Sequence, residues 1–281
     1  MACELRTLQR CILDAALEFR RICDKHGLNY FLIGGTLLGA VRHGGFIPWD
    51  DDMDVGMLRE DYEKFLKVCP QELSSDFFLQ TYETDASYAF GYAKIRVNGT
   101  VLAEDYAVRS KQHNGVFLDI FPYDDMPSGK VQQKMHYLLY KCVKWSALGK
   151  TDYDFQDPKK RKFANSMRLL FLPFSKNTMA GLEEKVCKMF RGGKRENAIN
   201  LGGAYQYREF TAKAGLETTT TLAFEGYDFK VPSNYKDLLT QMYGDYMKLP
   251  PVEKRGNQHQ MVEMDIGEYV IKNNAPAQAE G

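Results

Sequence analysis

A run of glycines followed by four aspartates, between residues 34 and 56, constrains the fold of this chain more than any other feature. Tyr30–Gly34 is a short apolar run that predicts a buried strand, and Gly34-Gly35 predicts a tight turn after it. Thr36–Arg42 predicts a short helix, which two further glycines end. From Asp52 onward polar and apolar residues alternate, which is typical of a strand with one polar face. The segment therefore predicts a strand, a glycine turn and an acidic second strand.

The aspartates of this segment are Asp50, Asp51, Asp52 and Asp54. Alternation along a strand places Asp52 and Asp54 on the same side, about 7 Å apart. Asp50 shares that side if the strand begins early, and Asp51 then points away. Hard cations prefer carboxylate oxygens, so these acids predict a site for Mg²⁺, or for Mn²⁺.

A solvated acidic loop is the alternative explanation of such a run. Two features argue against it. Apolar residues flank the acids and would anchor the backbone in the core: Phe46, Ile47, Trp49, Val55 and Met57. The glycines that precede the acids, Gly34 and Gly35 among them, let phosphate oxygens approach backbone N–H groups, and the N-terminus of a helix beginning near Thr36 helps to hold them. We therefore predict a combined metal and phosphate site.

Asp119 is the best candidate for a further acid of this site. It is a single charge inside the apolar run 116–121, where a charge is costly unless it is paired or bound to a metal. It is therefore either a metal ligand or half of a buried ion pair, for example with Arg96. A carboxylate in this place is also suited to deprotonate an attacking hydroxyl group.

Cations are expected to face a polyphosphate in such a site. Arg42 lies on the glycine-rich approach, and Lys94 and Arg96 alternate on one strand, so that they share a face. The alternative is that Lys94 and Arg96 are ordinary exposed strand residues. Arg255 and His259 follow a Pro-Pro pair near the C-terminus, and we expect them to reach back toward a nucleotide or a leaving phosphate.

The remaining periodicities predict an α+β fold, a mixed sheet flanked by helices. Residues 4–26 predict an amphipathic helix, 59–68 a second helix, and 77–82, 92–97 and 115–121 three strands. We expect a catalytic core over 1–125 and a helical region over 126–215, with 152–162 as a linker. A C-terminal hairpin and helix over 216–272 follow, in which Asn234 caps the helix, and 273–281 is expected to be a disordered tail.

Composition limits the partners of the chain. Its 37 basic and 37 acidic residues cancel, which excludes a strongly basic nucleic-acid coat, and we predict no nucleic-acid partner. The six cysteines form no CxxC pair and lie mostly in apolar runs, which is typical of a reducing compartment. No stretch approaches the roughly 20 apolar residues that span a bilayer. We predict a cytoplasmic protein, and a peripheral position at the inner membrane face stays open.

The run from Phe31 to Val55, FLIGGTLLGAVRHGGFIPWDDDMDV, closely resembles the signature of the LicD family and, more distantly, that of the fukutin-type proteins. The resemblance continues through Lys94-Ile95-Arg96, Gly99-Thr100, Glu104 and residues 117–122. It resumes at 224–227, Pro232, Tyr235 and 243–251, so that it covers residues 23 to 260. Its first block is long and specific.

This resemblance implies a nucleotidyltransferase-like fold and a phosphotransferase that uses a CDP-linked donor and releases CMP. LicD-type proteins add phosphocholine to cell-surface glycans, such as lipopolysaccharide, and to teichoic acids, and the fukutin-type proteins transfer ribitol phosphate. By motif match the metal-binding acids fall on Asp50, Asp52 and Asp54, with Asp119 on a later strand. CDP-choline is the donor that the resemblance favours, ahead of CDP-glycerol and CDP-ribitol.

Other classes stay open. A sugar-nucleotide glycosyltransferase also uses Asp-x-Asp with a metal, but that motif usually follows several strands, whereas here it follows one. Another nucleotidyltransferase stays open as well, although the long loop from Leu37 to Asp51 fits the LicD family and disfavours transfer of a nucleotidyl group to an antibiotic. A non-catalytic glycan-binding module is disfavoured by the intact set of acids.

Overall fold

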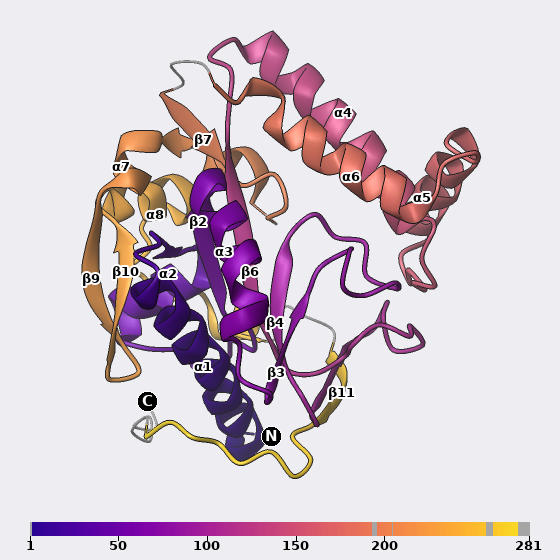
Figure 1. Cartoon of the computed structure of the whole chain (residues 1–281). Coiled ribbons are helices and arrows are strands. Elements are labelled where there is room, and N and C mark those ends of the chain that lie inside the picture. The colour runs from indigo at the N-terminus through magenta and orange to yellow at the C-terminus, as the bar shows by residue number, and fades with distance from the viewer. Residues whose placement is uncertain (1, 193–195, 204, 257–260, 275–281) are drawn as a thin grey trace.

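The computed structural model describes residues 2–192, 196–203, 205–256 and 261–274, and its centre is a mixed sheet (Figure 1). The strand order is β1-β2-β6-β4-β3, and only β2 and β6 run parallel within this order. The strands are β1 (Phe31–Leu32), β2 (Asp54–Leu58), β3 (Phe77–Gln80), β4 (Ala93–Val97) and β6 (Phe117–Asp125). The α+β prediction, a mixed sheet flanked by helices, is confirmed.

One face of the sheet is covered by α1 (Ala2–Lys25) and α3 (Arg59–Glu72). The buried stripe of α1 packs on apolar strand residues such as Val55 and Ile120. The rings of Phe19 in α1 and Phe65 in α3 lie 5.0 Å apart. Because side chains alternate along a strand, Asp54 and Asp119, which precede Val55 and Ile120, point to the opposite face.

The opposite face is bordered by α2 (Gly34–His43), α7 (Lys213–Glu217) and α8 (Tyr235–Tyr243). Gly56 of β2 lies under aromatic rings on this face. A Cβ atom at this position would come within 2.6 Å of Phe31 and 2.8 Å of Tyr123, so only glycine fits. The aromatic cluster closes one part of this face and leaves the part around Asp54 and Asp119 open.

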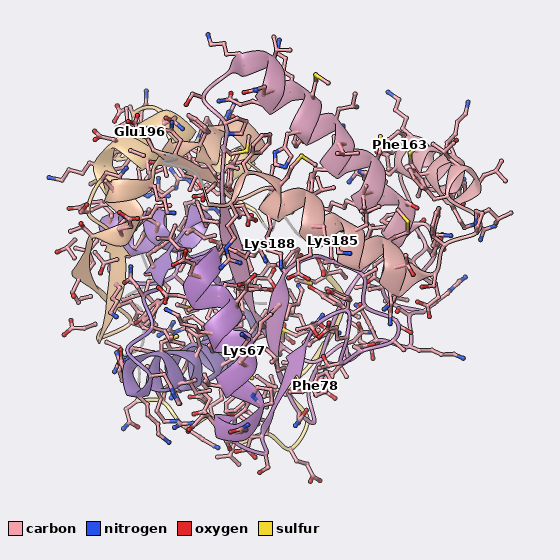
Figure 2. All side chains as sticks on the ribbon, turned by 45° about the horizontal axis from the view of Figure 1, so that its top comes forward. Lys67, Phe78, Phe163, Lys185, Lys188 and Glu196 are labelled. Carbon is pink, nitrogen blue, oxygen red and sulfur yellow. The ribbon has the colours of Figure 1, made fainter. Side chains whose placement is uncertain are left out.

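The helical region forms α4 (Lys130–Leu148), α5 (Pro158–Leu170), α6 (Lys176–Cys187) and the short η1 (Lys188–Phe190), which stand to one side of the sheet (Figure 1). Lys188, which is labelled in Figure 2, donates to Glu63 of α3 at 3.1 Å and links these helices to the core. The predicted linker 152–162 is wrong in its second half, because α5 begins at Pro158. Asp157 caps this helix by accepting from the N–H of Lys159 at 2.8 Å.

Residues 126–215 are not helical throughout, which corrects the sequence prediction. β7 (Asn197–Ile199) pairs with the end of β6, and β8 (Thr211–Ala212) pairs with β7. A short 3-10 helix, η2 (Gln206–Glu209), lies between them. This segment therefore extends the central sheet and returns the chain to the open face.

The predicted C-terminal hairpin and helix are confirmed as β9 (Thr219–Phe224), β10 (Tyr227–Pro232) and α8. The predicted cap is wrong in detail: the side chain of Asn234 makes no capping bond and donates instead to Thr211 at 2.8 Å. After α8 come η3 (Val252–Lys254) and β11 (Met261–Asp265), which pairs with β5 (Val101–Glu104). None of the described helices is long and apolar enough to cross a bilayer.

The predicted disordered tail begins too early. Asn273 is buried and donates to the carbonyl of Arg10 at 2.6 Å and to Asp14 at 3.0 Å. The guanidinium of Arg10 in turn donates to the carbonyl of Asn273 at 2.8 Å. The chain is therefore fixed on α1 at this point, and residues 275–281 lie outside the described part.

Candidate active site

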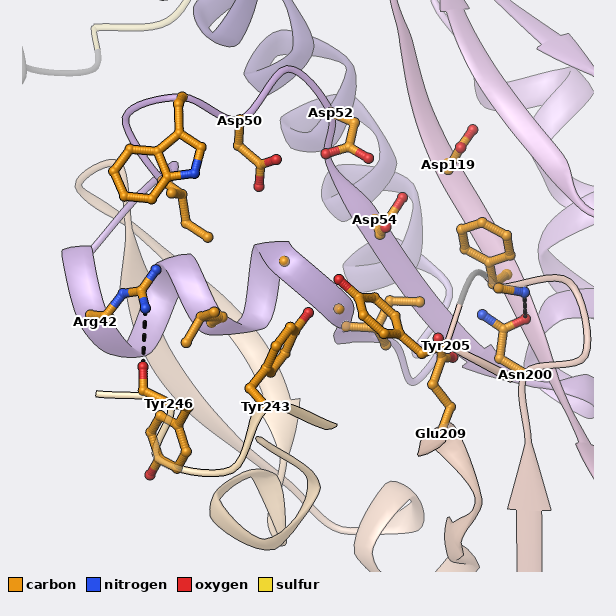
Figure 3. A pocket seen from close by; sticks show the side chains of 18 of the residues that line it. Arg42, Asp50, Asp52, Asp54, Asp119, Asn200, Tyr205, Glu209, Tyr243 and Tyr246 are labelled. Carbon is orange, nitrogen blue, oxygen red and sulfur yellow. Dashed lines mark hydrogen bonds between the residues drawn. The ribbon is translucent and has the colours of Figure 1, made fainter. Parts of the chain in front are cut away.

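A cavity of about 890 Å³ opens on the face that carries Asp54 and Asp119. Its walls come from five parts of the chain, namely residues 33–54, residues 92–121, α4, residues 200–209 and residues 243–251. Four predicted acids line it: Asp50, Asp52, Asp54 and Asp119 (Figure 3). The fold thus gathers the predicted acids in one place.

Asp54 and Asp119 lie side by side because of strand register. Asp54 of β2 is directly opposite Asp119 of β6, and Lys94 of β4 is opposite Asp119 on its other side. The Nζ atom of Lys94 lies 2.9 Å from an Asp119 oxygen. Asp119 is therefore in an ion pair, with Lys94 rather than with Arg96. Burial raises the pKa of Asp119, and the charge of Lys94 offsets part of that rise.

Asp50 and Asp52 lie on the loop before β2, since the strand begins at Asp54 and not at Asp52 as predicted. One carboxylate oxygen from each of Asp50, Asp51 and Asp52 lies within 4.8 Å of the other two. Asp51 is fully buried and does not line the cavity. Gln9 of α1 donates to the carbonyl of Asp50 at 2.9 Å, which anchors the loop. The acids are therefore held close together by the loop rather than by alternation along a strand.

The N-terminus of α2 faces these acids. Gly34 has φ +56°, and a Cβ atom at Gly35 would come within 2.9 Å of the Asp50 carboxylate. Thr36 accepts the N–H of Asp54 at 2.8 Å and thereby ties the helix to the start of β2; its side chain does not line the cavity. A helix N-terminus presents N–H groups and a positive partial charge, which is the arrangement that binds phosphate.

The predicted cations are placed in different ways. Arg42 lines the cavity and donates to the carbonyl of Tyr246 at 3.1 Å, and Lys94 lines it too (Figure 3). Arg96 is buried behind the cavity and donates to Gln80 and to the carbonyl of Gly115, both at 2.7 Å. Arg255 stacks 5.5 Å from the ring of Trp49, which itself lines the cavity. His259 lies outside the described residues.

Several lining residues were not anticipated from the sequence: Glu104, Lys144, Asn200, Tyr205, Glu209 and Tyr243. Glu209 stands out because it is a buried acid that accepts from Tyr123 at 3.1 Å. Burial raises its pKa to about 7. The rings of Tyr205 and Tyr243 lie 5.3 Å apart and face the acids (Figure 3). The glycine pair Gly202-Gly203 was a sequence signal for this wall of the cavity. The structure explains why glycine is needed at Gly203: a Cβ atom there would meet Asn200 and Glu209.

A mixed sheet that carries aspartates on neighbouring strands, beside the N-terminus of a helix that begins with two glycines, defines a nucleotidyltransferase-like domain. The family model for the LicD/FKTN/FKRP nucleotidyltransferase domain matches residues 27–182. The chain belongs to the LicD family, as its sequence signature predicts.

Individual relatives agree with this assignment. The chain is 33% identical to the lipopolysaccharide cholinephosphotransferase LicD of Haemophilus influenzae over 266 residues, which is 91% of this chain and 96% of that protein. It is 45% identical to the human ribitol 5-phosphate transferase FKRP over 62 residues, 21% of this chain and 12% of that protein. An uncharacterized Rickettsia typhi protein is 51% identical over 54 residues, 19% of this chain and 18% of that protein.

Proposed function

We propose that this chain is a metal-dependent phosphotransferase that moves phosphocholine from a CDP-linked donor to a hydroxyl group of a cell-surface glycan or teichoic acid, releasing CMP. The observation that carries the proposal is the convergence of Asp50, Asp52, Asp54 and Asp119 on the N-terminus of α2 within one cavity. The named activity of the Haemophilus influenzae relative, which aligns over most of both chains, supports choline as the transferred group.

Mg²⁺, or Mn²⁺, is the proposed cofactor. The fit rests on the carboxylate oxygens of Asp50, Asp51 and Asp52, which lie within 4.8 Å of one another, and on Asp54 and Asp119 in the same cavity. An all-oxygen set of this kind suits a hard divalent cation. When bound, the ion would neutralise charge on the pyrophosphate oxygens.

The residues of the chain would orient the donor and accept the proton of the attacking hydroxyl group. Lys94 and Arg42, together with the N–H groups at Gly34 and Gly35, would orient the pyrophosphate. An acceptor hydroxyl oxygen attacks the phosphorus that carries choline, the bond from that phosphorus to the bridging oxygen breaks, and CMP leaves with the bridging oxygen. The hydroxyl proton passes to a carboxylate, either Asp119 or Asp50. Glu209 is a third candidate, since its pKa of about 7 suits a general base.

Choline carries a quaternary ammonium, which proteins bind with aromatic faces. Trp49, Tyr92, Tyr205 and Tyr243 line the cavity, and Glu209 adds a carboxyl group on the same wall. This composition favours a cationic head group over the uncharged alditols of CDP-glycerol and CDP-ribitol. The acceptor is proposed from the family resemblance, and the cytoplasmic location from the cysteine pattern of the sequence.

The test is CMP release by the purified chain with Mg²⁺, comparing CDP-choline, CDP-glycerol and CDP-ribitol, without acceptor and then with a crude surface glycan. We expect CMP from CDP-choline, loss of CMP on chelation of the metal, and a fall of about a hundredfold or more in Asp54→Asn. Asp54→Asn keeps the size of the side chain and removes its charge.

The matched control is Asp228→Asn, a change at an exposed aspartate on β10 that lies outside the cavity lining, and it should leave CMP release unchanged. Release of UDP from a UDP-sugar, with no CMP from any of the three donors, would contradict the proposal and favour a glycosyltransferase. Equal CMP release by the parent and Asp54→Asn would show that the charge of Asp54 is not needed for the reaction.

A further inference from the structure

The α4 helix exposes an apolar stripe to solvent. Val131 is 72% exposed and Met135 68%, and Leu138 and Leu139 are exposed as well. These residues follow the spacing i, i+4, i+7, i+8, so they form one face of the helix. The opposite face, which includes Tyr140 and Val143, is buried against residues such as Met179 and Val186 of α6. α4 therefore has two apolar faces on opposite sides, and within the described chain only one of them is covered.

The α5 helix and the turn after it continue this exposed surface. Leu169 is 71% exposed and Leu170 66%, and Leu172 and Phe174 follow them in the turn. α5 packs against α4 and lies at the outer edge of the molecule (Figure 1). Its inner side is occupied by residues such as Phe163, whose ring lies 5.7 Å from that of Trp145 (Figure 2). Exposed apolar surface of this extent on a soluble domain indicates an interaction site.

The same two helices carry only positive charge. α4 contains four lysines and α5 five lysines and arginines, and neither contains Asp or Glu, although the whole chain has no net charge. Lys130, Lys134 and Lys141 run along one edge of the apolar stripe of α4, by their helical spacing. Lys159 and Lys162 share the solvent side of α5 with its exposed leucines. Within the described chain, these five lysines form no ion pair with a carboxylate.

We propose that α4, α5 and the turn 171–174 form a docking surface for an anionic phospholipid bilayer. The leucines would enter the boundary between head groups and acyl chains while the lysines contact lipid phosphates, as interfacial helices do. A second copy of this chain fits less well, because a two-fold contact would set one basic face against another. Since Lys144 of α4 lines the cavity, docking would hold the cavity close to the bilayer. This inference is independent of the reaction proposed above.

The test is cosedimentation of the full chain with vesicles of phosphatidylcholine alone or with about 30% phosphatidylglycerol, at about 0.1 M and about 0.5 M salt. We expect binding to the anionic vesicles that weakens at the higher salt. Lys159→Glu with Lys162→Glu, and separately Leu169→Glu with Leu170→Glu, should each lower the partition coefficient about tenfold or more. All four positions are exposed, so circular dichroism and the melting temperature should stay those of the parent.

Two controls match these variants. Lys67→Glu reverses an exposed charge on α3, and Val270→Glu adds a charge at a side chain that is 77% exposed and lies outside the helical region 126–215. Both should bind vesicles as the parent does. Absence of binding to anionic vesicles, or an equal loss in the controls, overturns the proposal. So does a dimer in sedimentation experiments that the leucine variants dissociate, since the occupant of the surface is then a second copy. None of these measurements uses a CDP-linked donor, so they fail or succeed separately from the proposed activity.

Discussion

At the scale of single residues, Glu183 of α6 is a buried carboxyl group whose ionisation should lower stability. Burial raises its pKa to about 7 from an ordinary value of 4.5. The folded protein therefore binds this proton more tightly than the unfolded chain does. The free energy of unfolding should fall as pH rises from about 4.5 to about 7, by about 3 kcal/mol from this group. Glu183→Gln should remove that fall, as measured by urea unfolding of parent and variant between pH 4.5 and 8.

The neighbouring Glu184 provides a control of opposite sign. Burial raises the pKa of Glu184, but its hydrogen bonds with Lys188 and Tyr82 lower that pKa by more than burial raises it. The pKa of Glu184 therefore lies below the ordinary value. Glu184 therefore adds stability above pH 4.5 that is lost as pH falls. As pH rises, the free energy of unfolding of Glu184→Gln should fall increasingly below that of the parent. Parallel pH profiles for parent and Glu183→Gln would contradict the assignment.

The sequence located those site residues whose chemistry is local. Asp54 was identified from the acidic run that it shares with Asp50 and Asp52, and Asp119 because a charge in an apolar strand needs a partner; strand register places the two side by side. Arg96 was expected at the cavity but does not line it, because strand alternation specifies a face of the sheet and not what covers that face. Its guanidinium donates instead to the side chain of Gln80 and the carbonyl of Gly115. Glu209 was not predicted because its contact with Tyr123 depends on the pairing of β7 with β6, which joins residues far apart in the chain.

At the scale of elements, the junction of α2 with the following loop depends on one glycine. A Cβ at Gly39 would lie 2.4 Å from the backbone oxygen of Gly45, a contact that a shift of the backbone alone can relieve. Gly39→Ala should therefore lower the free energy of unfolding by about 1–3 kcal/mol, despite the better helix propensity of alanine. Because the same loop carries the acids on to β2, donor binding should weaken too. Thermal unfolding and calorimetric titration with the donor measure the two effects.

Gly181 is the matched control, because it also lies within a helix, α6, and a Cβ there would meet nothing within 4 Å. Gly181→Ala should stabilise the protein by up to about 1 kcal/mol. If both variants melt alike, steric contact at Gly39 is not what selects glycine there.

Elements with strong periodicity were predicted well. α1, α3, the central strands and the hairpin β9–β10 all follow local patterns of apolar residues. The strands β5, β7, β8 and β11, which have two to five residues each, were not predicted. The start of α5, up to Lys162, was predicted as a linker because Lys159–Lys162 is a charged run. The helix is defined there by Asp157 as its cap and by Pro158 in its first turn.

At the scale of the whole molecule, Asn273 fastens the C-terminal segment to the first helix. Replacing Asn273 with alanine removes the amide donor from the carbonyl of Arg10 and from a carboxylate oxygen of the buried Asp14. Asn273→Ala should cost about 1–3 kcal/mol in the free energy of unfolding. Asn274→Ala is the control, because that side chain is exposed and the backbone N–H makes its hydrogen bond with Tyr227. Denaturant titration should separate the two; a shared midpoint would show that the segment adds no stability.

The residues that line the cavity are spread along the sequence from Ile33 to Pro251. The cavity is therefore complete only after nearly the whole chain has been synthesised. The acids leave the ribosome while Tyr205, Tyr243 and the segment up to Pro251 have not yet been translated. A nascent chain, or one ended early by a nonsense codon, carries the aspartates without the wall that encloses them. We expect such fragments not to catalyse the proposed transfer, so that the proposed activity begins only when nearly all of this sequence has been made.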